Sequence, residues 1–400
     1  MNRRVEGVDG ECVAAERRRI LVVDDEPGMR YAARRVLERR LDVSEAADGE
    51  EALRMLENET FHLALIDVRL PGISGLNLLS AIKTISPKID VIVMTGTAAD
   101  PDEALEDAVR REAFFFLRKP FPMSVLEMLT RRAAEAQILA ERNAAYVAAL
   151  EDNLESARVF QSRLLPPRAW QTTRAQLAAV YVPAERLSGD FFDYWPLPSG
   201  GTAIFIADVM GHGASAAMLT GIVKSQLRSL SSEIQDPGDV LEALEEELTR
   251  VGLGQFLTAF LVFDRPSEGE VFYAGAGHPP AFALRPGESM TPLASQGIPI
   301  NTGLPVTPRE SCGIARVPGT RLVLYTDGYP ETVDPRGVPF DDSAEDQPSG
   351  DVTPFHQAVA RALAADTPES AAQLLEAARS GFAGGHDGED DRAAVFAWLL

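Results

Sequence analysis

Short apolar runs alternate with amphipathic stretches through the first third of the chain. The apolar runs cover residues 20–24, 42–46, 63–67, 91–95 and 113–117. The stretches between them, such as 29–39, 50–58 and 76–85, carry apolar residues three and four positions apart, the spacing of an amphipathic helix. Strand-length runs that alternate with helical patterns are typical of βα units around a parallel sheet. This part of the chain therefore predicts an α/β fold with a doubly wound, five-stranded parallel sheet.

A long segment without glycine or proline follows, from Met123 to Leu165. It is rich in Ala, Leu, Glu and Arg, which are strong helix formers, so one helix of about forty residues is predicted. A heptad frame places mostly apolar residues on two seams of this helix, but the frame is imperfect because Arg132 and Asn153 also fall there. The other seam positions are Leu129, Ala136, Leu139, Asn143, Tyr146, Leu150, Ala157, Phe160 and Leu164. An intermolecular coiled coil is favoured, and with it a homodimer through residues 127–165. A rigid spacer and a folded-back helix are the alternatives.

The pattern after Pro167 is mixed. Strands are predicted at residues 177–182, 191–195, 203–208, 258–263, 271–273, 321–325 and 394–398, and helices at 214–231, 240–251 and 368–382. Several neighbouring strands have no helix between them, which predicts an α+β domain of packed antiparallel sheets flanked by helices. Residues 334–351, rich in Pro, Gly, Asp and Ser, are expected to form a mobile insertion. The expected domains are a flexible N-terminus (1–17), an α/β domain (18–126), a helical linker (127–165) and the α+β domain (166–400).

The composition describes a soluble globular protein of 400 residues, 45% hydrophobic and 24% charged, with a mean hydropathy of -0.07. The net charge of -22 disfavours binding to nucleic acid or to an anionic membrane surface. Cys12 and Cys312 are the two cysteines, so neither a disulfide framework nor a cysteine metal site is expected. No signal peptide or membrane-spanning segment is expected, and the predicted location is the cytoplasm.

The first group of chemically active residues lies at predicted strand ends of the α/β domain. Asp24 and Asp25 follow the first strand, Asp67 ends the third, and Thr95 and Lys119 follow the fourth and fifth. Because the carboxyl ends of parallel strands meet at one edge, these side chains should converge. Clustered aspartates suit Mg²⁺, and Asp67 could then attack a phosphoryl donor. The plain alternative is that these residues only end strands and form an ordinary loop.

This ordered set, with Pro71-Gly72, Gly75 and Lys119-Pro120-Phe121, resembles a response-regulator receiver domain of flavodoxin-like fold, from about Arg18 to Leu126. The resemblance implies that Asp67 accepts the phosphoryl group from a sensor histidine kinase or a phosphotransfer protein. It implies Mg²⁺ ligation by Asp24, Asp25, Asp67 and the Arg69 carbonyl. It also implies a switch formed by Thr95 and Phe116, where Phe replaces the commoner Tyr.

A second set of aspartates lies near the strand ends of the α+β domain: Asp190, Asp193, Asp208, Asp327, Asp390 and Asp391. Oxygen-only ligands favour Mg²⁺ or Mn²⁺ over Zn²⁺. Two such ions, roughly 3.5–4 Å apart, could activate a water and hold a phosphoryl group. Singly, each of these short motifs is more simply explained as a turn.

Together with the segments 275–280 and 324–331, and with the approach 154–166, they resemble the SpoIIE-like branch of metal-dependent PPM serine/threonine phosphatases. The resemblance implies two Mg²⁺ or Mn²⁺ ions. Asp208 would bridge them, with the Val209 carbonyl and Asp190 completing the sphere. Asp327 and Asp390 would hold the other ion, with Asp391 as the alternative to Asp390 and Asp193 as a further candidate. Departures from the family pattern are Ala393 for Thr and Asp341 for Gly, and His212 and His278 are expected to be structural.

The leading interpretation is a two-component response regulator in which phosphorylation at Asp67 controls a protein serine/threonine phosphatase. By resemblance, the expected substrate is a phosphorylated anti-sigma-factor antagonist of the STAS type in a partner-switching pathway. The alternative is a phosphorylation-gated adaptor whose phosphatase-like domain is catalytically silent. A transcription factor is disfavoured, because the chain is acidic and has no recognisable DNA-binding helix pair.

Overall fold

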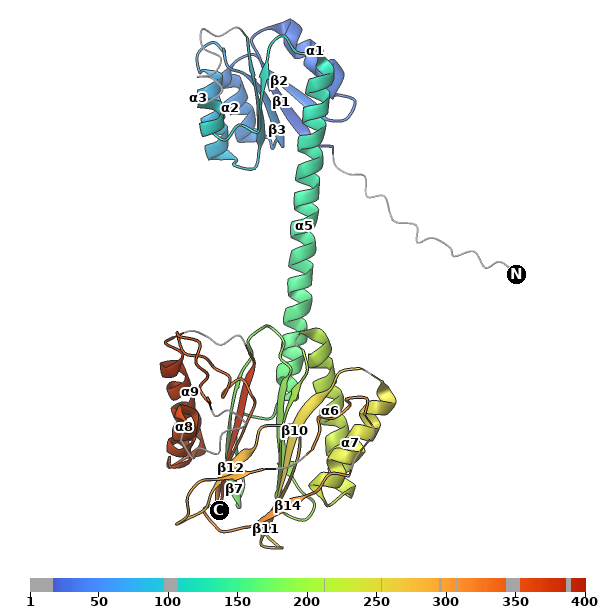
Figure 1. The fold of residues 1–400 in the computed structure, drawn as a ribbon. Helices are drawn as coiled ribbons and strands as arrows, with labels where there is room; N and C mark the ends of the chain where they lie inside the picture. The colour runs from blue at the N-terminus through green and yellow to red at the C-terminus, as the bar shows by residue number, and fades with distance from the viewer. Residues whose placement is uncertain are drawn as a thin grey trace, which may run out of the picture. The chain divides into compact units, whose positions relative to one another are not determined.

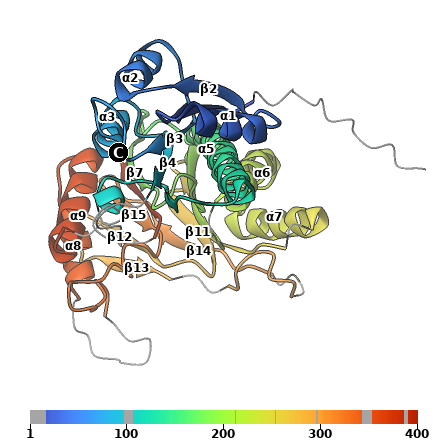
Figure 2. The same ribbon diagram turned by 90° about the horizontal axis from the view of Figure 1, so that it is seen from above.

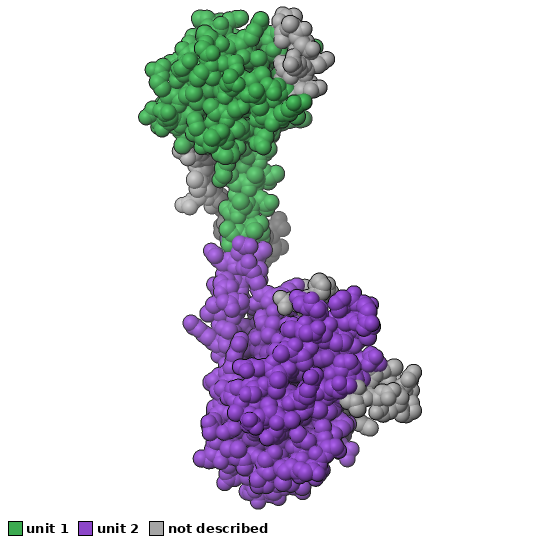
Figure 3. All heavy atoms as spheres, turned by 90° about the vertical axis from the view of Figure 1, so that its left-hand side faces the viewer, with its two compact units in different colours: residues 1–148 green, residues 149–400 purple. Residues whose placement is uncertain are grey.

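The computed structural model describes residues 17–96, 107–211, 213–252, 254–294, 297–304, 306, 308–342, 353–385 and 390–400. Contacts divide the chain into two compact units, an N-terminal unit of residues 1–148 and a C-terminal unit of residues 149–400 (Figure 3). Expectations for most of the N-terminal segment with Cys12, for His212 and for residues 343–351 of the insertion lie outside the described residues.

The N-terminal unit is built on a parallel sheet of five strands in the order β2-β1-β3-β4-β5. The strands are β1 (Arg19–Val23), β2 (Asp42–Ala46), β3 (Leu63–Asp67), β4 (Asp90–Thr95) and β5 (Phe115–Arg118). This topology confirms the predicted doubly wound sheet. The fifth strand begins two residues later than predicted, since Glu112 adopts a positive φ of 61° in the turn that precedes it.

Helices cover both faces of this sheet (Figure 1). They are α1 (Pro27–Leu37), α2 (Gly49–Asn58), α3 (Gly75–Ile85) and the first part of α5 (Met123–Leu164). Alternate residues of β1 point to opposite faces: Ile20 and Val22 pack with α1 and α5, whereas Leu21 and Val23 pack with α2 and α3. Since both faces are covered, the strands are buried and apolar along their length, and polar residues collect at their ends.

Helix α5 confirms the predicted long helix, ending one residue earlier, at Leu164. Its start packs into the N-terminal unit, where Leu126, Leu129 and Ala133 are buried. Leu129 therefore cannot serve as the first seam position of a coiled coil as predicted, because it already lies in the core of its own unit. Every side chain from 139 to 153 is exposed, and Leu139 (70%) and Tyr146 (72%) are among the most exposed apolar residues described.

The C-terminal unit contains two packed antiparallel sheets. The first has the order β14-β11-β10-β9-β8 and the second β13-β12-β15-β16-β7-β6. The strands are β6 (Ala169–Gln171), β7 (Ala175–Val182), β8 (Asp190–Pro196), β9 (Thr202–Val209), β10 (Leu257–Arg265), β11 (Glu270–Ala276), β12 (Ala281–Leu284), β13 (Thr291–Leu293), β14 (Cys312–Ala315), β15 (Arg321–Tyr325) and β16 (Arg392–Leu399). Side chains from both sheets, including Phe192, Ile204, Leu322 and Val395, form the core between them.

Two helix pairs enclose these sheets, as Figures 1 and 2 show. Helices α6 (Ala214–Glu233) and α7 (Pro237–Val251) pack on the first sheet, and α8 (Pro354–Leu363) and α9 (Pro368–Phe382) on the second. The predicted α+β architecture is confirmed. The strands β6, β12, β13 and β14 and the helix α8 were not predicted.

The expected mobile insertion is partly wrong in its described portion. Asp334 to Asp342 begin with a tight hairpin, in which the Asp334 N–H donates to the Val338 carbonyl over 2.9 Å and Val333 pairs with Pro339. The Asp334 carboxylate also accepts hydrogen bonds from the N–H groups of Arg336 and Val338. The turn is thus ordered by its own polar side chain, which is a common use of aspartate in loops.

Candidate functional site

The first candidate site lies at the carboxyl edge of the parallel sheet. Oxygens of Asp24, Asp25 and Asp67 all lie within 4.8 Å of one another. The Lys119 Nζ donates to Asp24 Oδ2 over 2.7 Å and to Asp67 Oδ2 over 2.6 Å. The backbone N–H of Arg69 donates to the other oxygen of Asp67 over 3.2 Å. The structure therefore brings the predicted carboxylates and lysine together from the ends of three different strands.

Charge balance at this edge depends on Lys119. Burial alone would lower the pKa of Lys119, but its hydrogen bonds to Asp24 and Asp67 raise the pKa above its usual value. The ammonium is therefore charged and offsets part of the repulsion between the aspartates. Three carboxylates and one lysine leave an excess of negative charge, and these oxygen donors fit a small, hard cation such as Mg²⁺.

The two predicted switch residues occupy neighbouring strands. Thr95 is buried at the end of β4, where its hydroxyl donates to the Gly96 carbonyl over 3.2 Å. Phe116, on β5, pairs with Val93 of β4 and is partly buried against the core on the α2 and α3 side of the sheet. Thr95 therefore ends β4 and Phe116 lies on the neighbouring strand β5. Residues 97–106, which follow Thr95, are outside the described part of the chain.

The second candidate site lies at one end of the two packed sheets. Asp190 and Asp208 face each other across neighbouring strands β8 and β9. Asp327 follows β15, and Asp390 precedes β16. Oxygens of Asp327, Asp390 and Glu331 all lie within 4.8 Å of one another. These five residues form what we call the acidic cluster.

Glu331 was missed as a site residue by the sequence analysis. Its N–H donates to the Asp327 carbonyl over 2.9 Å, so residues 327–331 form one helical turn. In such a turn, residues four positions apart lie on the same face. The signal in the sequence is the Asp-x-x-x-Glu spacing from Asp327 to Glu331, which places both carboxylates on one face if the segment is helical.

The acidic cluster is strained electrostatically. Burial, together with the charges of Asp327 and Asp390, raises the pKa of Asp208 to about 7. Burial and the charges of Asp390 and Glu331 raise the pKa of Asp327 to about 6. Asp190 is fully buried, and burial and Asp208 raise its pKa well above the usual value, although the Thr326 hydroxyl donates to it over 2.6 Å. Bound divalent cations would relieve this repulsion, so the donor set fits Mg²⁺ or Mn²⁺.

Two glycines allow the backbone to approach the cluster. A Cβ at Gly189 would lie 2.6 Å from the Val209 carbonyl oxygen and 3.3 Å from Asp208 Oδ1. A Cβ at Gly328 would lie 2.1 Å from the Asp391 carbonyl oxygen. A side chain at either position would collide with this backbone and push the acidic residues apart. Steric crowding therefore explains why glycine stands next to the aspartate in both motifs.

Asp391 and Asp193, the two aspartates outside the acidic cluster, have different surroundings. The Asp391 carboxylate accepts hydrogen bonds of 2.8 Å from the N–H groups of Ala184 and Gly189, so it anchors the loop before β8. Asp193 is buried and lies 3.1 Å from Lys224 Nζ and 2.9 Å from the Arg228 guanidinium, both on α6. Asp193 is thus paired with two cations, while Asp390 is the member of the Asp-Asp pair that joins the acidic cluster.

His278 links β10 and β15, two strands that lie next to residues of the acidic cluster. Its Nδ1 lies 2.8 Å from the Thr258 hydroxyl, and its Nε2 lies 3.1 Å from the Tyr325 carbonyl. Burial lowers the pKa of His278 to about 3, so the ring is neutral at physiological pH and donates through Nε2 to the carbonyl. Thr258 pairs with Asp208, and Tyr325 lies two residues before Asp327. His278 therefore bridges two strands beside the cluster, where the sequence analysis had expected a structural role such as fixing a turn.

Comparison with known proteins places this geometry in a family. The family model "Stage II sporulation protein E (SpoIIE)" matches residues 198–398, which is half of the chain. The chain belongs to the SpoIIE family. A second model, "Response regulator receiver domain", matches residues 20–131, so the chain combines a receiver domain with a SpoIIE domain.

Individual relatives of this SpoIIE family member align with only part of the chain. Protein IcfG of Synechocystis sp. is 29% identical over 211 residues, covering 46% of this chain and 33% of IcfG. Phosphoserine phosphatase RsbU of Bacillus subtilis is 30% identical over 134 residues, covering 33% of this chain and 40% of RsbU. The chain thus spans well under half the length of these two relatives.

A solved structure supports the fold of the SpoIIE domain. The SiaA-PP2C domain of Pseudomonas aeruginosa superimposes with a TM-score of 0.51 at 19% sequence identity, covering 64% of this chain and 99% of that domain. The C-terminal unit therefore has the PP2C fold. Among the described helices, none has both the length and the apolar character needed for a bilayer crossing.

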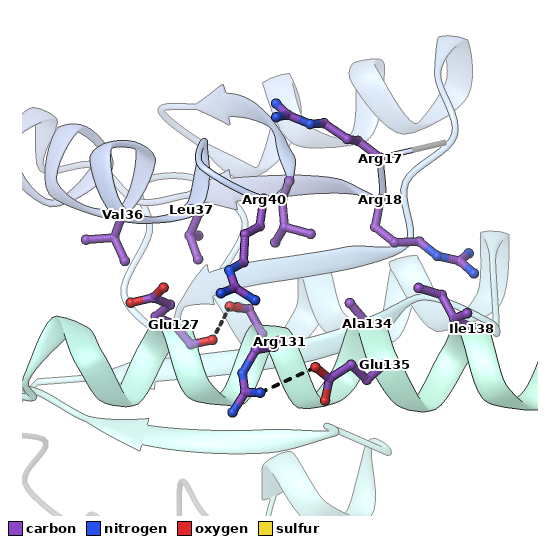
Figure 4. Close-up of a pocket in the computed structure, with 12 residues that line it drawn as sticks. Arg17, Arg18, Val36, Leu37, Arg40, Glu127, Arg131, Ala134, Glu135 and Ile138 are labelled. Carbon is purple, nitrogen blue, oxygen red and sulfur yellow. Dashed lines mark hydrogen bonds and ion pairs between the residues drawn. The ribbon is translucent and has the colours of Figure 1, made fainter. Parts of the chain in front are cut away.

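A pocket of about 210 Å³ opens between α1 and α5 of the receiver domain (Figure 4). Its apolar wall includes Leu37, Leu41 and Ile138, and arginines such as Arg40 and Arg131 stand around it. None of the residues that line it belongs to the aspartate site at the carboxyl edge of the sheet. The pocket is therefore separate from the predicted phosphorylation site.

Proposed function

We propose that this protein is a response regulator whose output is the hydrolysis of phosphoserine or phosphothreonine in a partner protein, controlled by phosphorylation of Asp67. The observation that carries the proposal is the acidic cluster, in which buried and half-buried carboxylates with raised pKa values converge from separate strand ends. Such a cluster is costly to fold without cations, and it matches the metal-dependent chemistry that the SpoIIE resemblance implies. The proposed domains are residues 18–126 (receiver), 127–165 (linker) and 166–400 (phosphatase).

In the receiver domain, Asp67 would attack the phosphorus of a phosphohistidine on a sensor kinase or phosphotransfer protein. The new bond joins an Asp67 oxygen to phosphorus, and the bond from phosphorus to the imidazole nitrogen breaks. Mg²⁺ held by Asp24, Asp25, Asp67 and the Arg69 carbonyl would offset the phosphoryl charge. Lys119 already contacts Asp67 and would stay paired with the phosphoryl oxygens, while the Thr95 hydroxyl would turn to donate to them.

In the phosphatase domain, Asp208, the Val209 carbonyl and Asp190 would hold one cation, and Asp208, Asp327 and Asp390 the second. Two Mg²⁺ or Mn²⁺ ions there would supply a water of lowered pKa and neutralise the phosphoryl group. Hydrolysis joins the water oxygen to phosphorus and breaks the bond to the serine oxygen, which ends protonated. The carboxylates of this chain orient the reactants and balance the charge.

The substrate is proposed to be a phosphorylated anti-sigma-factor antagonist of the STAS type. The name of the relative RsbU, a phosphoserine phosphatase, supports serine as the phosphorylated residue. The partners would be a sensor kinase on one side and this antagonist on the other, in a cytoplasmic pathway.

Control by Asp67 is proposed to act through helix α5 in a homodimer. The exposed side chains of Leu139, Tyr146, Leu150 and Phe160 lie at seven- and three-or-four-residue spacings that suit a parallel helix pair, and Asn143 would favour one register. A coupling free energy of 1–3 kcal/mol would change activity by roughly 5- to 150-fold. We propose activation, because phosphorylation would then assemble the active arrangement.

The test of the proposed function is hydrolysis by the full chain with Mn²⁺, measured on an aryl phosphate and on a phosphoserine STAS protein. Wild type should release phosphate from both, and Asp327→Asn should lose at least about a hundredfold in kcat, because one ligand of the cluster loses its charge. Asp152→Asn, which changes an exposed aspartate of α5, is the matched control and should keep wild-type turnover. Binding of the STAS protein without hydrolysis by wild type would favour the adaptor alternative.

A further inference from the structure

The last turn of α5 carries a buried glutamine with both polar atoms in use. Gln161 is 5% exposed, although its neighbours Phe160 and Ser162 are exposed. Its Nε2 donates to the Ser188 carbonyl over 2.7 Å, and the Ser188 N–H donates to its Oε1 over 3.2 Å. The Gln161 side chain thus hydrogen-bonds both the N–H and the carbonyl group of Ser188, as the backbone of a neighbouring strand would.

Ser188 leads directly into the acidic cluster. Its hydroxyl accepts a hydrogen bond from the Asp190 N–H over 3.1 Å. The next residue, Gly189, donates to the Asp391 carboxylate over 2.8 Å and accepts from the Val209 N–H over 3.2 Å. Residues 188–190 are therefore fixed to β9 and to the residue before β16, and Gln161 fixes them to α5.

Other contacts hold the same end of α5 to the phosphatase domain without reaching the cluster. The Lys224 ammonium on α6 donates to the Leu164 carbonyl and also pairs with Asp193. Arg186 donates to the Glu151 carbonyl over 3.3 Å. These contacts fix where the helix lies, whereas the Gln161 amide fixes the segment that carries Asp190.

We propose that Gln161 is a positioning residue for the cation site formed by Asp190, Asp208 and the Val209 carbonyl. Through Gln161, a rotation or shift of α5 changes the geometry of that site. This inference rests on the function proposed above and identifies the contact through which α5 regulates the cation site. The ligand distances of a metal site are expected to lie within about 0.2 Å of the values that the ion prefers. A small displacement of Ser188 is therefore sufficient to change cation affinity.

The experiment uses the full chain and two substitutions. Gln161→Met keeps most of the buried volume but loses both hydrogen bonds, and Gln161→Ala loses the volume as well. Ser162→Ala, at the exposed neighbour, is the matched control. Mn²⁺ binding is measured by the electron paramagnetic resonance signal of free Mn²⁺. The receiver contribution is subtracted with an Asp208→Asn/Asp327→Asn variant, which lacks two ligands of the cluster.

Gln161→Met and Gln161→Ala should both weaken one of the two Mn²⁺ sites of the cluster by about tenfold, in the range typical of residues that support metal ligands. kcat measured at limiting Mn²⁺ should fall accordingly and recover at high Mn²⁺, while KM for the aryl phosphate stays within about twofold. The ratio of activities with and without beryllofluoride should fall towards one. Ser162→Ala should match wild type in every measurement.

A purely structural role gives a different result. If Gln161→Met has the wild-type Mn²⁺ titration and beryllofluoride response, and only the melting temperature of the two variants falls, the proposal is wrong. The Mn²⁺ titration does not require turnover. If wild type binds Mn²⁺ but hydrolyses no phosphomonoester, the proposed function fails on its own, and the titrations of the variants still decide the role of Gln161.

Discussion

The acidic cluster should make the metal-free SpoIIE domain less stable as the pH rises. The pKa of Asp208 is raised from 3.8 to about 7, and that of Asp327 from 3.8 to about 6. Between pH 4 and pH 7 the folded state therefore binds more protons than the unfolded state. The free energy of unfolding falls with pH under that condition, so this contribution is fully present below about pH 4 and is lost as the pH passes 6 to 7.

The size of the effect follows from the same two groups. One pH unit of pKa difference corresponds to about 1.4 kcal/mol, so Asp208 alone would account for about 4 kcal/mol if it titrated independently. The two carboxylates interact and are partly exposed, so we expect a loss of about 3 to 4 kcal/mol in total between pH 4 and pH 8. For a domain of this size that corresponds to a fall of about 10 °C in Tm.

Tryptophan fluorescence is the assay, because Trp170, Trp195 and Trp398, the three tryptophans of the chain, all lie in the C-terminal unit. Thermal unfolding of the full chain is followed in EDTA at pH 5 and pH 8, and again at pH 8 with Mn²⁺. Tm should be lower at pH 8 in EDTA and should recover with Mn²⁺.

Two variants separate the cluster from the general acidity of the chain. Asp208→Asn/Asp327→Asn should lose most of the difference in Tm between pH 5 and pH 8, because neither amide titrates. Asp152→Asn, at an exposed site on α5, should keep it. Equal Tm values for wild type at both pH values in EDTA, or an undiminished difference in the double variant, would refute the reasoning.

Three further outcomes are expected. Asp67→Asn should abolish Mg²⁺-dependent labelling by acetyl phosphate, and persistent labelling would remove Asp67 as the acceptor. Glu331→Gln should raise the Mn²⁺ concentration for half-maximal hydrolysis by about tenfold, because a carboxylate beside Asp327 and Asp390 is lost; an unchanged Mn²⁺ requirement would exclude it from the site. Leu150→Glu should shift sedimentation with beryllofluoride towards the monomer and reduce activation, and the exposed control Glu155→Gln should do neither.

The receiver domain was predicted well because its chemistry follows from its topology. Parallel strands end at a common edge, so Asp24, Asp67 and Lys119 had to meet once the strands were recognised. The strands themselves are buried on both faces and stand out as apolar runs. In the C-terminal unit, the long central strands were found for the same reason, whereas β6, β12, β13 and β14 have only three or four residues each and leave little pattern.

The surroundings of individual aspartates were harder to predict. Asp193 belongs to the same short motif as Asp190, but it lies three residues further along β8 and therefore points to the opposite face of the strand. Its partners Lys224 and Arg228 come from α6, more than 30 residues along the chain. Glu331 depended on a single helical turn after Asp327, and Gln161 depended on a loop that is distant in sequence.

The exposed middle of α5 has a consequence for how such a chain can evolve. Because every side chain from 139 to 153 faces solvent, sequence change there is limited mainly by helix propensity and by the spacing of its apolar residues. An insertion of seven residues keeps those apolar residues in phase along one face, whereas an insertion of three or four moves them out of phase. Gene fusions that exchange the receiver for another sensory module would therefore be expected to succeed at whole-heptad lengths and to yield unregulated hybrids at others.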